Sequence, residues 1–202
     1  QYTQTLGQDI AGIRLGIVRE GFGTAVSESD VDAKVREAVQ ALAELGAQIQ
    51  EVSIPAHLKA GGMVWALLAE GMSALMFGNG VGHHWKGLYN ESFANALGTS
   101  LQVQAQDLTP QAKFVIMMGT YLNNAYHGRL YAKAQNQRRV LQAAYDRVFE
   151  QVDLLVMPTT PMKAHRYEPD LDTYARIEQG WNMLGNTAGF NLTGHPSLSL
   201  PC

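Results

Sequence analysis

Apolar positions at two different spacings divide the chain into a sheet-forming start, a helical middle and a sheet-forming end. Residues 13–18 form a short β-rich run bounded by glycines, which predicts a buried strand. From residue 31 to residue 45 apolar side chains recur at helical spacing, and residues 47–54 return as a second strand. Strand, helix and strand in this order make residues 1–56 a βαβ unit, which indicates a parallel or mixed sheet.

Residues 57–150 have the pattern of a helical region. Residues 57–77 are apolar all round the predicted helix, which is typical of a buried helix, a subunit interface or a pocket wall. After a glycine-rich break, an aromatic-rich loop follows, in which the adjacent His83 and His84 are interpreted as surface residues.

The second half of this region begins at a cap signal. Thr109 followed by Pro110 predicts a helix start, and the helical pattern continues to about residue 149. Gly119 and Gly128 are the two places where we expect this long helix to kink or split.

Residues 151–202 return to the sheet core. Residues 153–157 predict the best buried strand of the chain, a last helix is expected over 172–187, and another strand begins within 196–202, where the chain stops. The predicted fold class is α/β: a mixed β-sheet flanked by helices, with a mostly helical middle region that covers the pocket.

Composition excludes several classes of protein. With 46% hydrophobic and 16% charged residues the chain is not disordered, and its net charge of −3 argues against a nucleic-acid binder. A single cysteine excludes a disulfide framework and a cysteine-held zinc, and none of the six histidines pairs with another at helical spacing, so we expect no metal. No secretory signal is visible and no run approaches the ~20 apolar residues of a membrane span, so we expect a cytoplasmic protein with no membrane contact.

The common catalytic motifs are missing from the sequence. There is no Gly-x-Ser-x-Gly elbow and no phosphate loop, and the dinucleotide fingerprint that starts at Gly21 and Gly23 has Val26 at its third glycine position. The residues by themselves therefore give no catalytic constellation.

Two long stretches resemble the amidase signature family. They are DLLVMPTTPMKA at 153–164 and GNTAGFNLTGHPSLSLPC at 185–202, with shorter matching stretches at 12–22, 85–89 and 131–136. The chain resembles most the bacterial amidases of small aliphatic and aromatic amides, which often accompany nitrile hydratases.

This resemblance implies amide hydrolysis through an acyl-enzyme, with a Ser–cis-Ser–Lys triad and no cofactor. This sequence has no Gly-Gly-Ser-x-Arg-like run and no matching lysine before it, so no catalytic residue can be carried over to it. We therefore expect the chain to be a segment of a longer amidase and to be inactive alone. Its expected partners are a small-molecule amide and, as is usual in the family, a second copy in a homodimer.

Four residues are predicted to bind substrate. In relatives that release ammonia from glutamine for tRNA amidation, an acidic residue a few positions before the Phe-Asn-Leu-Thr-Gly motif meets the substrate's amino group. Here that position is about Leu184, which cannot pair an ammonium group and fits an uncharged, apolar acyl group. Trp65 is expected on the opposite wall, and Asn186 and Thr187 are polar groups near the site; core packing and loop hydrogen bonds are the competing interpretation for all four.

Two other functions remain open. One is a glutamine amidotransferase A subunit, which Leu184 disfavours. The other is a non-catalytic interaction domain derived from an amidase, in which residues 57–77 form a binding or dimer surface.

Overall fold

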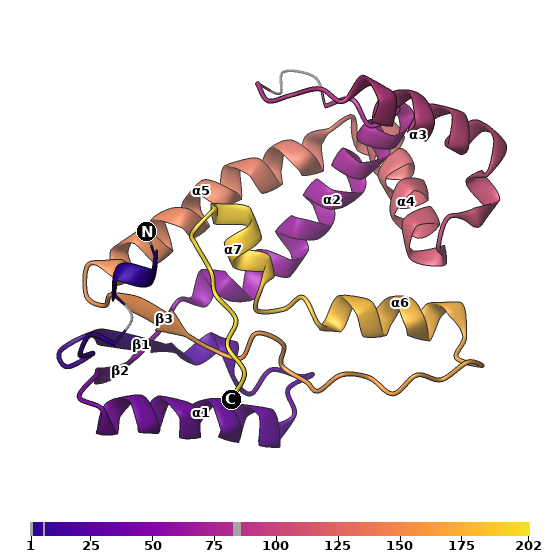
Figure 1. The fold of residues 1–202 in the computed structure, drawn as a ribbon. Coiled ribbons are helices and arrows are strands. Elements are labelled where there is room, and N and C mark those ends of the chain that lie inside the picture. Colours follow the sequence, from indigo (N-terminus) through magenta and orange to yellow (C-terminus); the bar gives the residue numbers. More distant parts are fainter. Residues whose placement is uncertain (1, 6, 83–85) are drawn as a thin grey trace. The chain divides into compact units, whose positions relative to one another are not determined.

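The computed structural model describes residues 2–5, 7–82 and 86–202, which group into two compact units (Figure 1). The sheet unit contains Gln1–Gly61, Arg139–Asp170 and Glu178–Cys202, and the helical unit contains Gly62–Arg138 and Leu171–Ile177. His83 and His84, interpreted from the sequence as surface residues, lie outside the described residues.

The sheet unit is built on three parallel strands. They are β1 (Arg14–Val18), β2 (Gln48–Val52) and β3 (Leu154–Val156), in the order β2-β1-β3. Helix α1 (Ser29–Glu44) connects β1 to β2, which confirms the βαβ unit and the α/β class. Because each strand is reached through a helical connection, both described strand pairs are parallel; of the parallel and mixed arrangements, the parallel one forms here.

The core of the sheet unit lies around the central strand. In β1, Leu15 and Val18 are buried, and the backbone of Gly16 lets the side chain of Val152 approach: a methyl group on that glycine would lie 3.1 Å from it. The sequence predicts β3 to be the best buried strand, but β3 is an edge strand, so Leu154 is 53% exposed.

Short 3-10 turns flank the strands of this sheet. They are η1 (Tyr2–Thr5) near the start of the chain, η2 (Arg19–Gly21) after β1 and η3 (Pro55–Lys59) after β2. The last two lie at the carboxyl ends of their strands and supply residues of the candidate site.

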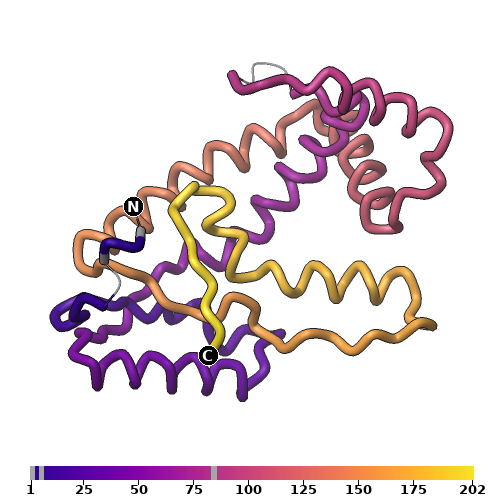
Figure 2. The backbone as a smooth tube through the Cα atoms, in the orientation of Figure 1, coloured from indigo at the N-terminus to yellow at the C-terminus, as the bar shows by residue number. Residues whose placement is uncertain are grey.

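The end of the chain differs from the prediction. The helix expected over 172–187 ends early, as α6 (Thr173–Asn182), and a further helix, α7 (Ala188–Thr193), follows it. The strand expected within 196–202 does not form: the segment is extended (Figure 2), with Leu198 and Leu200 exposed. Alternating apolar residues make a strand only where a neighbouring strand supplies backbone partners, and this segment is tied instead by a side-chain bond of 2.9 Å between Ser199 and Thr159.

The helical unit contains the helices of the middle region. They are α2 (Ala60–Phe77), α3 (Glu91–Val103), the turn η4 (Ala105–Asp107), α4 (Pro110–Tyr126) and the first part of α5 (Arg129–Phe149). The predicted cap at Thr109 is confirmed, since its hydroxyl accepts a hydrogen bond of 3.3 Å from the amide of Ala112. The long helix splits at Gly128 rather than at Gly119, because His127 and Gly128 both have positive φ angles, of 53° and 76°.

Two features hold this unit together. Helices α2 and α4 approach so closely at Gly119 that a methyl group there would lie 1.8 Å from the carbonyl oxygen of Ala69. Glu70 is a buried carboxylate in the mostly apolar α2, and it accepts a 3.2 Å hydrogen bond from the amide of Tyr131 in the first turn of α5. A negative charge is favourable there because the amino end of a helix carries a partial positive charge.

By length and composition alone, Pro55–Phe77 could cross a membrane, with 23 residues and a mean hydropathy of 1.4. This corrects the expectation that no run approaches a membrane span. The core helix of a soluble protein meets the same criterion, and Glu70, which binds α5, is a group that membrane-spanning helices rarely carry.

The close contact at Gly119 leads to a first prediction. We expect Gly119→Ala to lower the free energy of unfolding by about 3 kcal/mol, because the added methyl group overlaps backbone atoms that cannot rotate away. Gly62→Ala in α2 is the control: nothing lies within 4 Å of the new methyl group, and alanine favours the helix by about 0.5–1 kcal/mol. Urea unfolding of both variants measures the difference, and equal stabilities would contradict the close packing.

Candidate functional site

The candidate site lies at the carboxyl ends of the three parallel strands, which is where open α/β sheets usually bind ligands. Three buried polar side chains meet there: His57 from η3, Tyr145 from α5 and Asn186 from the turn between α6 and α7. We call these three side chains the His57 relay. All of them belong to the sheet unit.

Asn186 joins the ends of two strands. Its side-chain amide donates one hydrogen bond of 2.9 Å to the carbonyl of Gly21, after β1, and one of 2.7 Å to the carbonyl of Pro158, after β3. Both amide hydrogens are thereby used, and the reversed orientation of the amide would place its oxygen against two carbonyl oxygens. The amide oxygen therefore faces the imidazole of His57, with 3.4 Å between Oδ1 and Nε2.

This orientation fixes the tautomer of His57. Because Oδ1 of Asn186 can only accept, Nε2 of His57 carries the hydrogen and Nδ1 is left as an acceptor. Nδ1 lies 2.6 Å from the hydroxyl oxygen of Tyr145, which therefore donates to it. The relay thus runs in one direction, from the hydroxyl of Tyr145 through a neutral imidazole to the two carbonyls.

Burial keeps both ring groups uncharged. The imidazole of His57 is 2% exposed, and burial lowers its pKa below the ordinary value of 6.5, against the smaller opposing effects of Asn186 and the charge of Glu20. Burial likewise raises the pKa of the Tyr145 hydroxyl well above its ordinary value. Neither group supplies a charge or a free base, so the relay can hold and orient neighbouring segments rather than catalyse a reaction.

Helix α7 packs directly on the relay. A methyl group on Gly189 would lie 2.2 Å from the hydroxyl oxygen of Tyr145 and 3.2 Å from Nδ1 of His57, so only glycine fits there. The next side chain, Phe190, stacks on the ring of Tyr145 with 5.1 Å between ring centres and 22° between planes. The start of α7 is therefore fitted to the hydrogen bond between Tyr145 and His57.

Glu20 closes the gap between the ends of β1 and β2. Its carboxylate accepts hydrogen bonds of 2.8 Å from the amide of Ile54 and 2.5 Å from the hydroxyl of Ser53. Burial opposes its ionisation, but these hydrogen bonds outweigh burial and lower the pKa of Glu20 below its ordinary value. The segment that carries His57 is thus anchored to the turn after β1.

Three of the four predicted substrate-binding residues lie in one turn. Asn186 is its buried anchor, while Leu184 and Thr187 are half-buried on either side. The carbonyl of Leu184 accepts hydrogen bonds from the Thr187 hydroxyl, at 3.3 Å, and from the amide of Ala188, at 3.0 Å. Trp65 belongs to the helical unit, where its ring meets that of Phe114 edge-on at 5.8 Å.

Sequence reasoning missed the partners of Asn186. Tyr145 lies on the apolar face of a predicted helix, which is a pattern typical of the core. Because a buried tyrosine usually needs a hydrogen-bond partner for its hydroxyl, its position could have indicated a buried polar contact. His57 follows directly after a predicted strand and its terminating proline, which places it at the ligand-binding edge of a parallel sheet.

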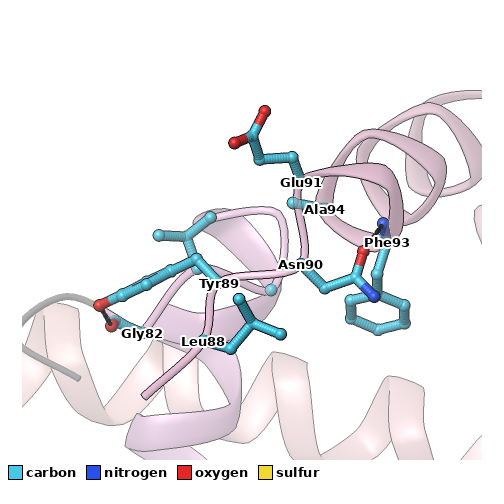
Figure 3. A pocket seen from close by; sticks show the side chains of 9 residues that line it. Gly82, Leu88, Tyr89, Asn90, Glu91, Phe93 and Ala94 are labelled. Atoms are coloured by element: carbon cyan, nitrogen blue, oxygen red, sulfur yellow. Dashed lines mark hydrogen bonds between the residues drawn. The ribbon is translucent and has the colours of Figure 1, made fainter. Parts of the chain in front are cut away.

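The helical unit contains a separate hollow of about 510 Å³ between Gly80 and Ala94 (Figure 3). Its polar groups serve the backbone: Tyr89 donates to the carbonyl of Gly82, and Asn90 caps α3 by accepting from the amide of Phe93. Residues 83–85, between Gly82 and Lys86, lie outside the described residues, and we assign no site there. Among the described residues, no group of three or more His, Cys, Asp or Glu side chains could hold a metal ion.

A three-stranded parallel sheet with helical connections defines this chain as an α/β protein. The chain belongs to the amidase family, whose sequence profile matches residues 1–202. It is 32% identical over 205 residues to the A subunit of the glutamyl-tRNA(Gln) amidotransferase of Macrococcus caseolyticus, with 100% of this chain and 41% of the relative covered. It is 35% identical over 191 residues to an enantioselective amidase of Rhodococcus rhodochrous, with 93% and 37% covered.

Solved structures show the same fold. A bacterial aryl acylamidase of the amidase signature family matches with a TM-score of 0.67 at 17% identity, covering 96% of this chain and 38% of that one. The A subunit of the glutamyl-tRNA(Gln) amidotransferase of Thermotoga maritima matches with a TM-score of 0.58 at 21% identity, covering 92% and 34%. The chain therefore spans about two fifths of the length of the curated relatives that it matches.

The buried imidazole leads to a prediction on pH. Because the pKa of His57 is lower in the folded chain, the unfolded chain takes up the proton first as the pH falls below about 6.5. The contribution of the neutral His57 to the free energy of unfolding is therefore complete above that pH. It is lost as the pH falls toward the pKa of His57 in the folded chain. We expect His57→Gln to flatten the decline of the free energy of unfolding between pH 7 and pH 5, measured by urea titration. His165→Gln, at an exposed histidine, is the control and should keep the decline of the wild type. If the decline in His57→Gln were as steep as in the wild type, the assignment would be contradicted.

A further prediction concerns the contact between α7 and the relay. We expect Gly189→Ala to lower the free energy of unfolding by about 3 kcal/mol, because its methyl group would overlap the buried hydroxyl of Tyr145. Gly180→Ala in α6 is the matched control, since nothing lies within 4 Å of the added group and the helix favours alanine. Thermal unfolding compares the two, and a tolerated Gly189→Ala would show that α7 does not pack as described.

Proposed function

We propose that this chain forms the acyl pocket of an amidase that hydrolyses small apolar carboxamides to a carboxylic acid and ammonia. Membership of the amidase family supports the reaction class. The chain covers about two fifths of its relatives, and its sequence has no Gly-Gly-Ser-x-Arg-like run, which supports a Ser–cis-Ser–Lys triad supplied from outside these residues.

One observation carries the substrate class: the turn that holds Leu184 presents no charged side chain. Residues 183–187 are Met, Leu, Gly, Asn and Thr, and the polar side chain of Asn186 is fully engaged with the strand ends. An ammonium group next to Leu184 would lose water without gaining a partner, whereas a phenyl or alkyl group would lose nothing. The acyl group of the amide is therefore proposed to be uncharged and apolar.

In this proposal the chain's own residues bind and orient rather than react. Leu184 contacts the acyl group and excludes water from it, and substrate binding by Trp65 stays a prediction. Nucleophilic attack, proton transfer and oxyanion stabilisation belong to the triad segment in this proposal. Residues 1–202 alone are therefore expected to show no turnover. Hydrolysis of this kind needs no cofactor; a homodimer, a cytoplasmic location and the lack of a membrane partner stay predictions.

A glutamine amidotransferase A subunit is the second candidate, since the relative from Macrococcus caseolyticus matches the whole chain at 32% identity. The two candidates differ in the group that the pocket must accept. A glutamine pocket has to neutralise an α-ammonium group, and the uncharged turn at Leu184 supports the apolar amide instead. A non-catalytic interaction domain is the third, and turnover by the full-length protein would exclude it.

The test is ammonia release by the full-length protein from benzamide, propionamide and L-glutamine. We expect kcat/KM for the two apolar amides to exceed that for glutamine by about 100-fold or more, because the charged group would be buried without a partner. Leu184→Glu should lower kcat/KM for benzamide by about 10-fold or more, since it places a charge against the apolar acyl group. Leu45→Glu, on a 64% exposed leucine at the end of α1, is the matched control and should leave it unchanged.

Glutamine as the best substrate would favour the amidotransferase, and would contradict the proposal. Equal effects of Leu184→Glu and Leu45→Glu would show that Leu184 does not contact the acyl group.

A further inference from the structure

We infer that His57 and Tyr145 are positioning residues that set which acyl groups the enzyme accepts, by fixing the turn that carries Leu184. This inference rests on the proposed function, in which that turn lines the acyl pocket. Neither residue touches the acyl group in this scheme; both act through Asn186 and through the start of α7.

The turn depends on Asn186 for its attachment to the sheet. Within the turn, the backbone hydrogen bonds are local, from the amide of Leu184 to the carbonyl of Trp181 and from the amide of Ala188 to the carbonyl of Leu184. The Asn186 side chain, by contrast, reaches the ends of β1 and β3 and the imidazole of η3. Leu184 is two residues from this anchor, so a shift of Asn186 moves the leucine with it.

The relay holds Asn186 in one orientation because its hydrogen bonds have one direction. Tyr145 donates to Nδ1 of His57 over 2.6 Å, and Nε2–H then faces Oδ1 of Asn186 over 3.4 Å. Removing the Tyr145 hydroxyl leaves Nδ1 of a buried imidazole without a donor. The ring can then exchange tautomers or rotate, and the oxygen of Asn186 loses its fixed partner.

The packing around the relay converts a small change into a displacement of the turn. The backbone of Gly189 lies so close to the Tyr145 hydroxyl that no side chain fits between them. Phe190 stacks on the ring of Tyr145. Both residues follow the turn directly at the start of α7. A change in the position of Tyr145 or His57 is therefore passed to residues 183–187 through α7 as well as through Asn186.

The experiment compares variants of the full-length protein with benzamide and propionamide as substrates. Tyr145→Phe keeps the ring and removes the hydroxyl, and we expect the ratio of the two kcat/KM values to change by about fivefold, the effect of one buried hydrogen bond. The change should appear mainly in KM, because the reacting groups lie outside this chain. His57→Gln keeps a donor and an acceptor and should retain more of the wild-type ratio than His57→Leu, which keeps neither.

Leu141→Ala is the matched stability control. Leu141 is fully buried on α5, one helical turn before Tyr145, and contributes no hydrogen bond to the relay. It should lower the melting temperature at least as much as Tyr145→Phe and leave the substrate ratio unchanged. A ratio unchanged in Tyr145→Phe, or changed equally in Leu141→Ala, would overturn the positioning role.

A second measurement does not depend on activity. In the wild-type protein labelled with ¹⁵N-histidine, we expect the signal of His57, identified by its loss in His57→Gln, to report the neutral Nε2–H tautomer at pH 7. An Nδ1–H tautomer or an imidazolium would overturn the relay even if Tyr145→Phe did not fold. A wild-type protein that hydrolyses neither amide would instead contradict the proposed function, and the tautomer would still show whether the relay exists.

Discussion

The carboxamide of Asn186 donates hydrogen bonds to two backbone carbonyls at the carboxyl edge of the sheet. Gly21 and Pro158 are buried and lie beyond the last paired residues of β1 and β3. A buried carbonyl without a donor costs about 1–3 kcal/mol, so one side chain that serves both fixes the relative positions of two strand ends. Since its oxygen must then accept, the tautomer of His57 and the role of Tyr145 follow from it.

Different interactions stabilise the inside of each of the two units. In the sheet unit, a polar network and the carboxylate of Glu20 connect segments that leave the strands. In the helical unit, the contact of Gly119 with the backbone of Ala69 brings two helices close, and Glu70 caps a third. A network specifies orientation, because each donor needs its own acceptor, whereas a glycine contact specifies distance only.

The direction of the hydrogen bonds in the relay has a consequence for the substrate class under the proposed function. The hydrogen bonds of the relay engage both ring nitrogens of His57 and the whole amide of Asn186. Under the proposed function, the relay therefore shapes the pocket and takes no part in the reaction. Relatives at 32% and 35% identity carry the names of a tRNA-dependent amidotransferase subunit and an enantioselective amidase. Under the proposed function, a change of one side chain in the turn at Leu184 alters the substrate class while the anchoring hydrogen bonds stay the same.

The sequence by itself determined the βαβ start, the cap at Thr109 and the family, because periodicity, caps and motifs are local signals. It did not determine that residues 196–202 form no strand with the part of the chain that the structure describes, nor did it reveal the helices α3 and α7. Only the tertiary structure revealed the relay, because Tyr145 and Asn186 lie 88 and 129 residues from His57 along the chain. Hydrogen-bond direction depends on which groups meet after folding, and no local pattern of residues contains that information.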